Sequence, residues 1–361
     1  MFNLAVDEED ELLSFGLQWV AGLAQRMDEV TVITMREGRH DLPGNVKVLS
    51  AGGERGLSEP RRAANFYRHL FAALAKFRPG ACFSHMNQVF SALAGPVLWA
   101  ARIPLFTWYT HRQGSFFLRA AHAFSRVILT AESGSYPYSG AKVRPCGHGI
   151  DTGFFSPHGD IPGGEDPLIL MVSRLSPIKG IETVLQALGA LKERGLPFRA
   201  AIVGAEPGGK GDYTQRVKME INRMGLGGIV KLPGKASREE VLGWYRMSSV
   251  HVNASPPGLF DKVALEAMSC SRPSLVCNEG FRETLGDYAD LLLFRKDDPA
   301  DLADRLEALL GMDSENLRRM GAYLRERVIE LHSLDRLLDL LAGFIDSDNI
   351  METGGFPAGD P

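Results

Sequence analysis

Residues 168–204, LILMVSRLSPIKGIETVLQALGALKERGLPFRAAIVG, decide the fold of this chain. The stretch opens with the apolar run 168–173 and closes with a second run at 198–204. Short apolar runs of this kind are typical of strands buried on both faces of a sheet. A helix is predicted between them, from about Gly180. A strand, a helix and a second strand in this order indicate a parallel pair joined by a helical crossover, so the stretch predicts a parallel α/β fold.

The same alternation extends over nearly the whole chain of 361 residues. Further strands are predicted at 29–34, 46–50, 104–110, 126–131, 229–232 and 250–255, and further helices near 213–224 and 238–248. Residues 148–167 interrupt the pattern with five glycines and three prolines, as a hinge between domains would. We therefore expect two Rossmann-like domains, at 1–155 and 165–333. An apolar helix at 334–347 can pack on either domain, with the first domain as the expected partner, and the tail 348–361 is expected to be disordered.

Composition indicates a globular protein without a membrane span. The chain is 45% hydrophobic and 23% charged, and it contains no run of about 18 uninterrupted apolar residues. Residues 1–13, MFNLAVDEEDELL, carry acids where a signal peptide would carry Lys or Arg, so a cytoplasmic location is expected. The spacing of the cysteines predicts neither a zinc site nor a disulfide scaffold: Cys82, Cys146, Cys270 and Cys277. No metal and no cofactor are predicted.

Positive charge is concentrated in the first half of the chain, although the formal net charge of the whole chain is −4. Residues 55–150 contain twelve Lys or Arg and two acids. Aromatic residues are interleaved with these cations: Phe66, Tyr67, Phe71, Phe77, Phe116 and Phe117. Such a region suits an anionic membrane or a phosphorylated acceptor, so we expect peripheral contact with the inner face of a membrane and no nucleic-acid partner. A solvated surface balanced by acids elsewhere in the fold would explain the charge equally well.

Polar residues follow the strands of the second predicted domain, where ligands bind in open α/β sheets. Arg174 and Lys179 follow the first of these strands just before a helix, and two cations beside a helix N-terminus suit a diphosphate. Gly204 ends the next strand and would let a ligand approach the backbone. Lys235 follows a third strand and could face a nucleobase, although a turn before a Ser-capped helix explains it about as well.

The stretch SPPGLFDKVALEAMSC, residues 255–270, places the carboxylate of Glu266 one turn inside a predicted helix. The first turn of a helix exposes N–H groups and the positive end of the helix dipole, and these attract phosphates and carboxylates alike. The stretch is therefore either an anion site or a helix that stabilises itself.

Four motifs in this order resemble the nucleotide-sugar-binding domain of retaining glycosyltransferases of family 4, the group 1 glycosyl transferases: SRLSPIKG, VGAEP, LPGKASREEVLGWYRMSSVHVNAS and DKVALEAMSC. That family has the GT-B fold, in which two Rossmann-like α/β domains face a central cleft. The resemblance covers residues 165–335 and extends more loosely to WYTHR and HGIDTGFF. It implies that Arg174 and Lys179 bind the donor diphosphate. It also implies that N–H groups near Lys262 and Val263 hold a phosphate, and that Glu266 accepts hydrogen bonds from the ribose hydroxyls.

The chain departs from that family at the acid that normally contacts the transferred sugar. The family places two glutamates eight positions apart, and eight positions before Glu266 stands Gly258. Either Asp261 and Lys262 hold the donor hydroxyls, or the donor sugar lacks the usual contact. The glycine pair that family members often carry after the first strand is also missing, and only Gly16 is present near the first helix.

The candidate site combines these positions with one histidine of the first domain. His111 follows a strand end, where the resemblance puts a histidine beside the donor sugar. The catalytic candidates are His111, Arg174, Lys179 and Glu266. The donor-binding candidates are Gly16, Ser173, Gly204, Lys235, Gly258, Asp261, Lys262 and Val263.

These features predict a retaining glycosyltransferase that moves a hexose-type sugar from a nucleoside diphosphate sugar to an unidentified acceptor, with a lipid-linked or cell-envelope polysaccharide precursor as the expected class. No D-x-D motif stands at a strand end, so cations and helix N–H groups are expected to neutralise the leaving diphosphate. The alternatives are a GT-B sugar-nucleotide epimerase and a nucleotide-sugar-binding scaffold without activity. A nicotinamide dehydrogenase is not expected, because no G-x-G-x-x-G follows a strand.

Overall fold

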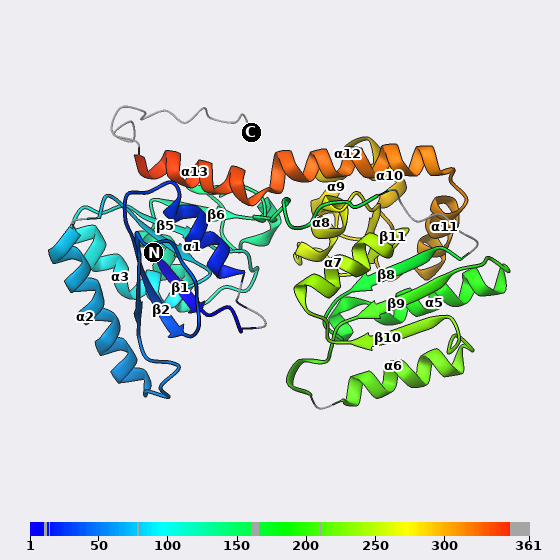
Figure 1. Cartoon of the computed structure of the whole chain (residues 1–361), viewed down its shortest axis with the longest axis horizontal. Helices are drawn as coiled ribbons and strands as arrows, with labels where there is room; N and C mark the ends of the chain where they lie inside the picture. Colours follow the sequence, from blue (N-terminus) through cyan, green and yellow to red (C-terminus); the bar gives the residue numbers. More distant parts are fainter. Residues whose placement is uncertain (11–12, 14, 78, 160–165, 210, 347–361) are drawn as a thin grey trace. The chain divides into compact units, whose positions relative to one another are not determined.

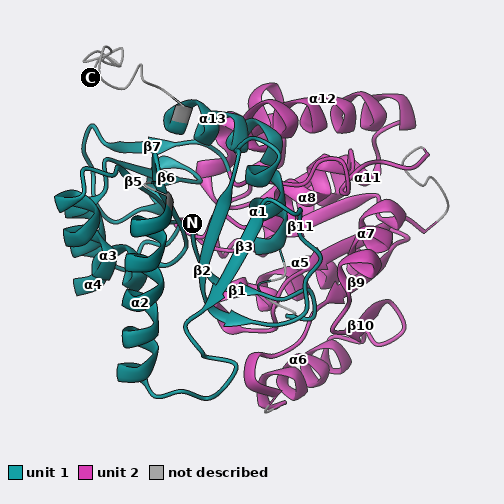
Figure 2. Cartoon of the chain, turned by 60° about the vertical axis from the view of Figure 1, so that its left-hand side comes forward, with its two compact units in different colours: residues 1–147, 334–361 teal, residues 148–333 magenta. Residues whose placement is uncertain are grey.

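The computed structural model describes residues 1–346 except 11, 12, 14, 78, 160–165 and 210. The chain forms two compact units (Figure 2): unit 1 contains residues 1–147 and the segment from Leu334 onward, and unit 2 contains His148–Ser333. Unit 2 thus begins before the expected boundary at residue 155. The reason is that the Ile150 N–H donates to the His332 carbonyl at 2.7 Å, which ties the start of this unit to its end. The expected disordered tail lies outside the described residues.

Unit 1 is built on a parallel sheet of seven strands in the order β3-β2-β1-β4-β5-β6-β7. Figure 1 labels β1, β2, β5 and β6 of this sheet. The strands are β1 Phe2–Val6, β2 Val30–Glu37, β3 Val46–Ser50, β4 Cys82–His85, β5 Leu105–Trp108, β6 Val127–Thr130 and β7 Val143–Pro145. Most of these strands are short and buried, as both faces of a parallel sheet must be covered by helices.

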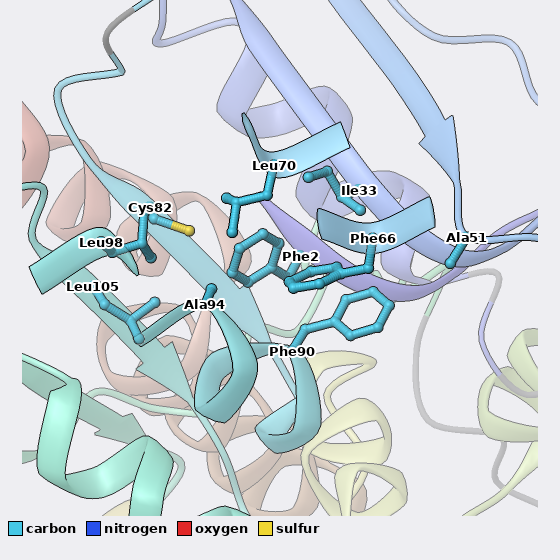
Figure 3. Packing of buried hydrophobic residues seen from close by; sticks show 10 residues of the cluster. All are labelled: Phe2, Ile33, Ala51, Phe66, Leu70, Cys82, Phe90, Ala94, Leu98 and Leu105. Carbon is cyan, nitrogen blue, oxygen red and sulfur yellow. The ribbon is translucent and has the colours of Figure 1, made fainter. Parts of the chain in front are cut away.

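Helices cover both faces of the sheet of unit 1. From β1 the chain adds strands first on one side, towards β2 and β3, and then on the other side, from β4 to β7. Because the crossovers are right-handed, those that run in opposite directions place their helices on opposite faces of the sheet. The helices are α1 Gly16–Ala24, α2 Glu59–Phe77, α3 Gln88–Ala100, α4 Phe116–Phe124 and α13 Leu334–Asp346, with a 3₁₀ turn η1 at Ser133–Ser135. Helices α2 and α3 pack on the sheet through an apolar cluster (Figure 3): Phe2, Ile33, Ala51, Phe66, Leu70, Cys82, Phe90, Ala94, Leu98 and Leu105. Phe66 therefore belongs to the core and not to a membrane-facing surface.

The last described helix, α13, packs on unit 1. Leu338 lies against Gly22 of α1, where a Cβ would come within 2.2 Å of its Cδ1. The ring of Phe344 stacks on Phe106 of β5, with centroids 5.8 Å apart. Arg26 donates to the Asp339 carboxylate at 2.6 Å. The C-terminal helix thus returns to the unit in which the chain begins.

Unit 2 is built on a parallel sheet of five strands in the order β10-β9-β8-β11-β12. The strands are β8 Leu168–Val172, β9 Arg199–Val203, β10 Val230–Gly234, β11 Val250–Asn253 and β12 Ser274–Val276. The helices are α5 Ile181–Glu193, α6 Asp212–Arg223, α7 Arg238–Met247, α8 Lys262–Ser269, α9 Arg282–Leu285, α10 Ala289–Leu292, α11 Pro299–Leu310 and α12 Ser314–His332. The 3₁₀ turns are η2 Pro177–Lys179, η3 Pro207–Gly209, η4 Glu279–Phe281 and η5 Gly286–Tyr288. The predicted architecture of two parallel α/β units is confirmed.

No helix in the described part of the chain is both long enough and apolar enough to cross a membrane.

Candidate functional site

The strand order of unit 2 reverses between β8 and β11, and open α/β sheets bind ligands where this happens. From β8 the chain moves outward to β9 on one side, and β11 lies on the other side. The loops that follow these two strands therefore meet at the carboxyl edge. Gly180 shows how close they come: its φ is +64°, and a Cβ there would lie 2.8 Å from the Ala254 carbonyl oxygen. A side chain would push the two loops apart.

An ion pair joins the two loops. Lys179 is only 6% exposed, and its Nζ lies 2.6 Å from Asp261 Oδ2. The same oxygen accepts from Asn253 Nδ2 at 3.1 Å and from the Ser255 hydroxyl. Burial opposes ionisation of this carboxyl, but the positive charge of Lys179 and the hydrogen bonds outweigh it and hold the pKa of Asp261 below its ordinary value. The site therefore contains a fixed, ionised carboxylate.

This pairing differs from the expected pair of Asp261 and Lys262. Asp261 is the N-cap residue of α8 in extended backbone, with φ −76° and ψ 132°, and its side chain makes no capping hydrogen bond. Its carboxylate reaches Lys179 across the loops. Lys262, the first residue of the helix, instead interacts electrostatically with Glu266, which lies one turn along the same helix.

Glu266 belongs to a second polar group on α8. Tyr245 of α7 is fully buried and donates its hydroxyl to Glu266 Oε2 at 3.0 Å. Burial raises the pKa of Glu266, against the opposing effects of Lys262 and this hydrogen bond. Burial also lowers the pKa of Lys262 to about 8, although Glu266 acts to raise it. Arg238, the first residue of α7, adds positive charge beside both groups and pairs with Asp151 at 2.9 Å.

Three predicted site residues lie directly after β8 and β9: Ser173 and Arg174 follow β8, and Gly204 follows β9. Arg174 is exposed and has no hydrogen-bond or ion-pair partner within the described part of the chain. The Ser173 hydroxyl oxygen is buried, and no described group bonds to it. Gly204 has φ +141°, and a Cβ there would lie 1.9 Å from the Ser173 carbonyl oxygen. The glycine therefore permits close contact between the two strand ends.

The loop before α8 is held by several contacts within unit 2. His148 Nε2 donates to the Phe260 carbonyl at 2.9 Å, and its ring stacks on the Phe260 ring. Burial lowers the pKa of His148 to about 3, with a further contribution from the charge of Lys262, so this imidazole stays neutral near pH 7. Asn278 Nδ2 donates to the Leu259 carbonyl at 3.1 Å. The contacts give the loop one conformation and fix the start of α8.

Unit 2 contains three further predicted site residues: Gly258, Val263 and Lys235. Gly258 has φ +90°, in the left-handed region that favours glycine. Val263 is half-buried in the first turn of α8. Lys235 is exposed after β10, where Gly234 has φ +88°. The donor-binding role of these three positions stays a prediction.

Two predicted site residues belong to unit 1. His111 is exposed in the segment after β5, with its ring centroid 6.4 Å from that of Tyr109. Gly16 is buried at the start of α1, where a Cβ would lie 2.8 Å from Asn3 Nδ2. Packing against Asn3 is therefore sufficient reason for a glycine at this position.

Sequence reasoning missed four residues that build the site of unit 2: Asn253, Ser255, Arg238 and Tyr245. Asn253 and Ser255 could have been found, because polar residues at the end of a buried strand lie at the carboxyl edge. Tyr245 gives no such signal, since an aromatic residue on an amphipathic helix is ordinarily a core residue. Among the described residues, no group of three or more His, Cys, Asp or Glu side chains is placed to hold a metal ion.

Comparison with known proteins gives a family match for most of unit 2. Residues 160–327 match the family described as glycosyl transferases group 1, which confirms the resemblance noted from the sequence at the level of this group. Membership of family 4 and retention of configuration stay predictions.

Curated relatives are matched over part of their length. D-inositol 3-phosphate glycosyltransferase of Thermomonospora curvata is 26% identical over 58% of this chain and 53% of its own length. The enzyme of the same name from Nocardia farcinica is 33% identical over 43% of this chain and 35% of its own length. WcaL of Escherichia coli K12, a glycosyltransferase named for colanic acid biosynthesis, is 28% identical over 52% of this chain and 47% of its own length. The chain thus spans about half or less of the length of these relatives.

Solved structures resemble the whole chain. The Anabaena protein HepE, crystallised with UDP and glucose, has a TM-score of 0.72 at 17% identity, over 96% of this chain and 99% of its own. Sucrose-phosphate synthase of Thermosynechococcus elongatus has a TM-score of 0.72 at 19% identity, over 95% of this chain and 97% of its own. These similarities show the fold alone, and the expected GT-B class is confirmed.

Proposed function

We propose that this protein, whose residues 160–327 match the group 1 glycosyl transferases, transfers a hexose-type sugar from a nucleoside diphosphate sugar to an acceptor, with retention of configuration. The observation that carries the proposal is the carboxyl edge of unit 2. There the loop that carries Arg174 is joined to the loop that opens α8 by the Lys179–Asp261 ion pair. An exposed guanidinium and the first N–H groups of a helix are suitable donors to a diphosphate. The UDP in the Anabaena structure supports a nucleotide sugar as the donor class.

The residues divide the work of transfer between charge and position. As the bond between the anomeric carbon and the diphosphate oxygen breaks, Arg174 and the N–H groups of the first turn of α8 neutralise the leaving group. The acceptor oxygen forms the new bond on the same face, and its proton passes to the departing diphosphate oxygen. Glu266 accepts from the ribose hydroxyls and orients the donor. The acceptor is a lipid-linked or cell-envelope saccharide precursor, a class supported by the colanic acid relative.

The experiment that tests the donor is a thermal-shift panel of UDP-, GDP- and ADP-sugars, because a ligand that binds only the folded state raises its melting temperature. One base should give the largest shift, and Arg174→Ala should reduce it. With that donor and cell-extract acceptors, NMR of the product should show the anomeric configuration of the donor. Release of an epimerised sugar nucleotide would instead identify an epimerase, and binding without turnover would identify a scaffold.

A second observation concerns exposed aromatic and basic residues of unit 1, where we expect the acceptor to bind. Phe116 is 81% exposed and Phe117 is 42% exposed at the start of α4, in a run of exposed residues that includes Arg112. On α2, the exposed residues Arg61, Arg68 and Phe71 share one helical face. Exposed aromatic rings beside cations are suited to an anionic lipid surface. Unit 1 therefore makes peripheral contact with an anionic membrane that carries the acceptor.

Vesicle co-sedimentation tests this contact. Wild type should bind vesicles of phosphatidylglycerol at low salt and be released at high salt, because the Debye length shrinks to about 3 Å at 1 M salt. Phe116→Ser/Phe117→Ser and Arg61→Glu/Arg68→Glu should each reduce binding. Met219→Ser, which removes an exposed apolar side chain of unit 2, is the matched control and should leave it unchanged. Absence of binding at low salt would favour a soluble acceptor.

A further inference from the structure

We propose that unit 1 contains a ligand site of its own, a cavity at the amino edge of its sheet that binds a small amphiphile with an apolar body and a cationic head. The inference goes beyond the proposed function, because sugar transfer requires no such ligand. Its evidence is the place and size of the cavity, the apolar residues of its floor and the carboxylates at its mouth.

The cavity lies where the strands of unit 1 begin. Its volume is about 620 Å³, and it is lined by the first residues of three strands: Phe2 of β1, Val30 of β2 and Cys82 of β4. Parallel strands begin at one edge of a sheet, and ligands of open α/β sheets ordinarily bind at the other, carboxyl edge. The cavity is therefore separate from the ordinary ligand position of this unit.

The floor of the cavity is apolar. Five of its lining residues are labelled in Figure 3, and each is at most 6% exposed: Phe2, Ile33, Leu70, Cys82 and Leu98. Burial raises the pKa of the Cys82 thiol to about 11, so the floor stays uncharged near pH 7. An alkyl or aryl group is the occupant that suits such a floor, because it loses contact with water there.

The size of the cavity favours a ligand over a packing defect. Protein interiors are close-packed, and voids larger than a water molecule are few in a domain. Sites that bind small molecules have volumes of about 300–1,000 Å³, and this cavity falls within that range.

Carboxylates determine the charge at the mouth. Asp28 and Glu29 line the cavity and are exposed, and within the described part of the chain neither side chain has a hydrogen-bond or ion-pair partner. Arg26 also lines the cavity, but its guanidinium pairs with Asp339 at 2.6 Å and with Asp335 at 3.4 Å. The positive charge of Arg26 is thus compensated by acids of α13, and Asp28 and Glu29 favour a cationic head on the ligand.

The amino group of Met1 does not offset these carboxylates. It donates to the Thr31 carbonyl at 2.7 Å, and burial lowers its pKa, which favours its neutral form. The charge at the mouth is therefore that of Asp28 and Glu29.

The experiment is isothermal titration with three probes of equal chain length: octylammonium, octanol and octanoate. Octylammonium should bind most tightly and octanoate most weakly. High salt should weaken octylammonium more than octanol, because salt screens exposed charges. From butylammonium to octylammonium the affinity should rise about fourfold for each added CH₂, as expected when the chain is buried.

Two kinds of variant locate the bound probe. Ala73→Leu, at a lining position of α2, should weaken octylammonium and octanol about tenfold or more, because the chain is kept out of the cavity. Its matched control is Ala72→Leu, at the exposed neighbouring position. Asp28→Asn and Glu29→Gln should each weaken octylammonium about two- to fivefold and leave octanol unchanged. Their matched control is Glu59→Gln, at the start of α2, where the side chain is 91% exposed.

The outcomes that would overturn the proposal are distinct from those that bear on sugar transfer. Equal affinity for octylammonium and octanoate would overturn the cationic class of ligand. Equal binding by Ala73→Leu and Ala72→Leu would overturn the cavity as the site, and so would the absence of binding of all three probes to wild type. If Ala73→Leu does not fold by circular dichroism, the double variant Asp28→Asn/Glu29→Gln decides, and unchanged octylammonium binding there would overturn the site. The proposed function does not depend on any of these results, because it is tested with nucleoside diphosphate sugars.

Discussion

Each unit has its own parallel sheet, in which the strand order reverses beside the first strand of that sheet. The two units differ in the charged side chains that lie near this reversal. In unit 2 the reversal between β8 and β11 holds the buried pair of Lys179 and Asp261. In unit 1 the reversal lies at β1, and the segment after this strand carries ion pairs at the surface, such as Glu8 with Arg39 at 2.8 Å, where the side chains are 40% and 75% exposed.

The end of β4 in unit 1 is filled with aromatic rings instead. His85 packs between Trp19 and Trp108, with centroids 4.4 and 5.2 Å away. A buried ion pair carries the desolvation cost of two charges and is a weak source of stability, whereas the packed rings at this edge form no ion pair with one another. We infer that the buried charges of unit 2 are kept for a ligand and that the equivalent edge of unit 1 is chiefly structural. The predictions below test this contrast in order of expected size.

The largest difference is expected when one partner of an ion pair is removed from each unit. Lys179→Met leaves a buried carboxylate without its cation and should destabilise unit 2 by about 3–5 kcal/mol. Arg39→Met, the matched change in unit 1, should cost about 0–1 kcal/mol, because water screens the exposed pair of Arg39 with Glu8. Urea titration followed by hydrogen exchange, read separately on peptides of each unit, measures both. Similar losses in the two units would remove the contrast, and Lys179→Met/Asp261→Asn should recover stability if the unpaired charge is the cause.

A glycine at a strand end of unit 2 and a glycine of the segment between β3 and α2 in unit 1 provide the next test. Gly204→Ala adds a Cβ that would lie 1.9 Å from a backbone oxygen at φ +141°, so it should cost about 3 kcal/mol through strain and displacement of β8 from β9. Gly56 of unit 1 also has a positive φ, +66°, but no atom within 4 Å of an added Cβ. Gly56→Ala should therefore cost only about 1 kcal/mol. Thermal unfolding of the two variants measures the difference, and equal costs would mean that the ends of β8 and β9 do not need close contact.

Acid should weaken unit 2 through two buried histidines. Burial lowers the pKa of His148 and of His251 from 6.5 to about 3, so each stays neutral in the folded unit while the unfolded chain gains a proton below pH 6.5. The free energy of unfolding should therefore fall as the pH falls from 6.5 towards 3, by about 1.4 kcal/mol per pH unit for each histidine.

His148→Asn should reduce that pH dependence, by about 2 kcal/mol at pH 5 relative to pH 7. Denaturant unfolding at several pH values, monitored by the fluorescence of Trp244, the single tryptophan between residues 148 and 333, measures the slope. The exposed His158→Asn is the matched control and should leave the slope unchanged. A slope unaffected by His148→Asn would show that this imidazole takes up a proton in the folded unit.

The smallest effects are expected at two helix caps. The Ser237 side chain accepts from the Glu240 N–H at the start of α7, and the Glu240 carboxylate accepts from the Ser237 N–H in return. Ser115 accepts from the Leu118 N–H at the start of α4 without such a return bond. Ser237→Ala should cost about 1 kcal/mol and Ser115→Ala somewhat less. Amide exchange in the first turn of each helix should become faster, and more so for Ser237→Ala. A larger loss of stability for Ser115→Ala would show that the reciprocal bond of Glu240 adds no stability.

Much of the fold was predictable because its signals are local. The helix expected near 213–224 is Asp212–Arg223, and the one near 238–248 is Arg238–Met247, since apolar spacing and a Ser cap act within a few residues. The parallel pairing of β8 with β9 followed from the strand, helix and strand of 168–204. The position of Arg174 and Lys179 at a carboxyl edge followed from the same pattern.

The tertiary structure decided which of these residues meet. Lys179 and Asp261 are 82 positions apart, and Tyr245 reaches Glu266 from another helix, so no local spacing could pair them. The sequence alone determined the order of the elements and the edge at which polar side chains gather, because hydrophobic period and capping are properties of short segments. Only the packed sheet decided that Asp261 pairs with Lys179 and not with Lys262, because that choice depends on which strands become neighbours and on how far their loops are brought together.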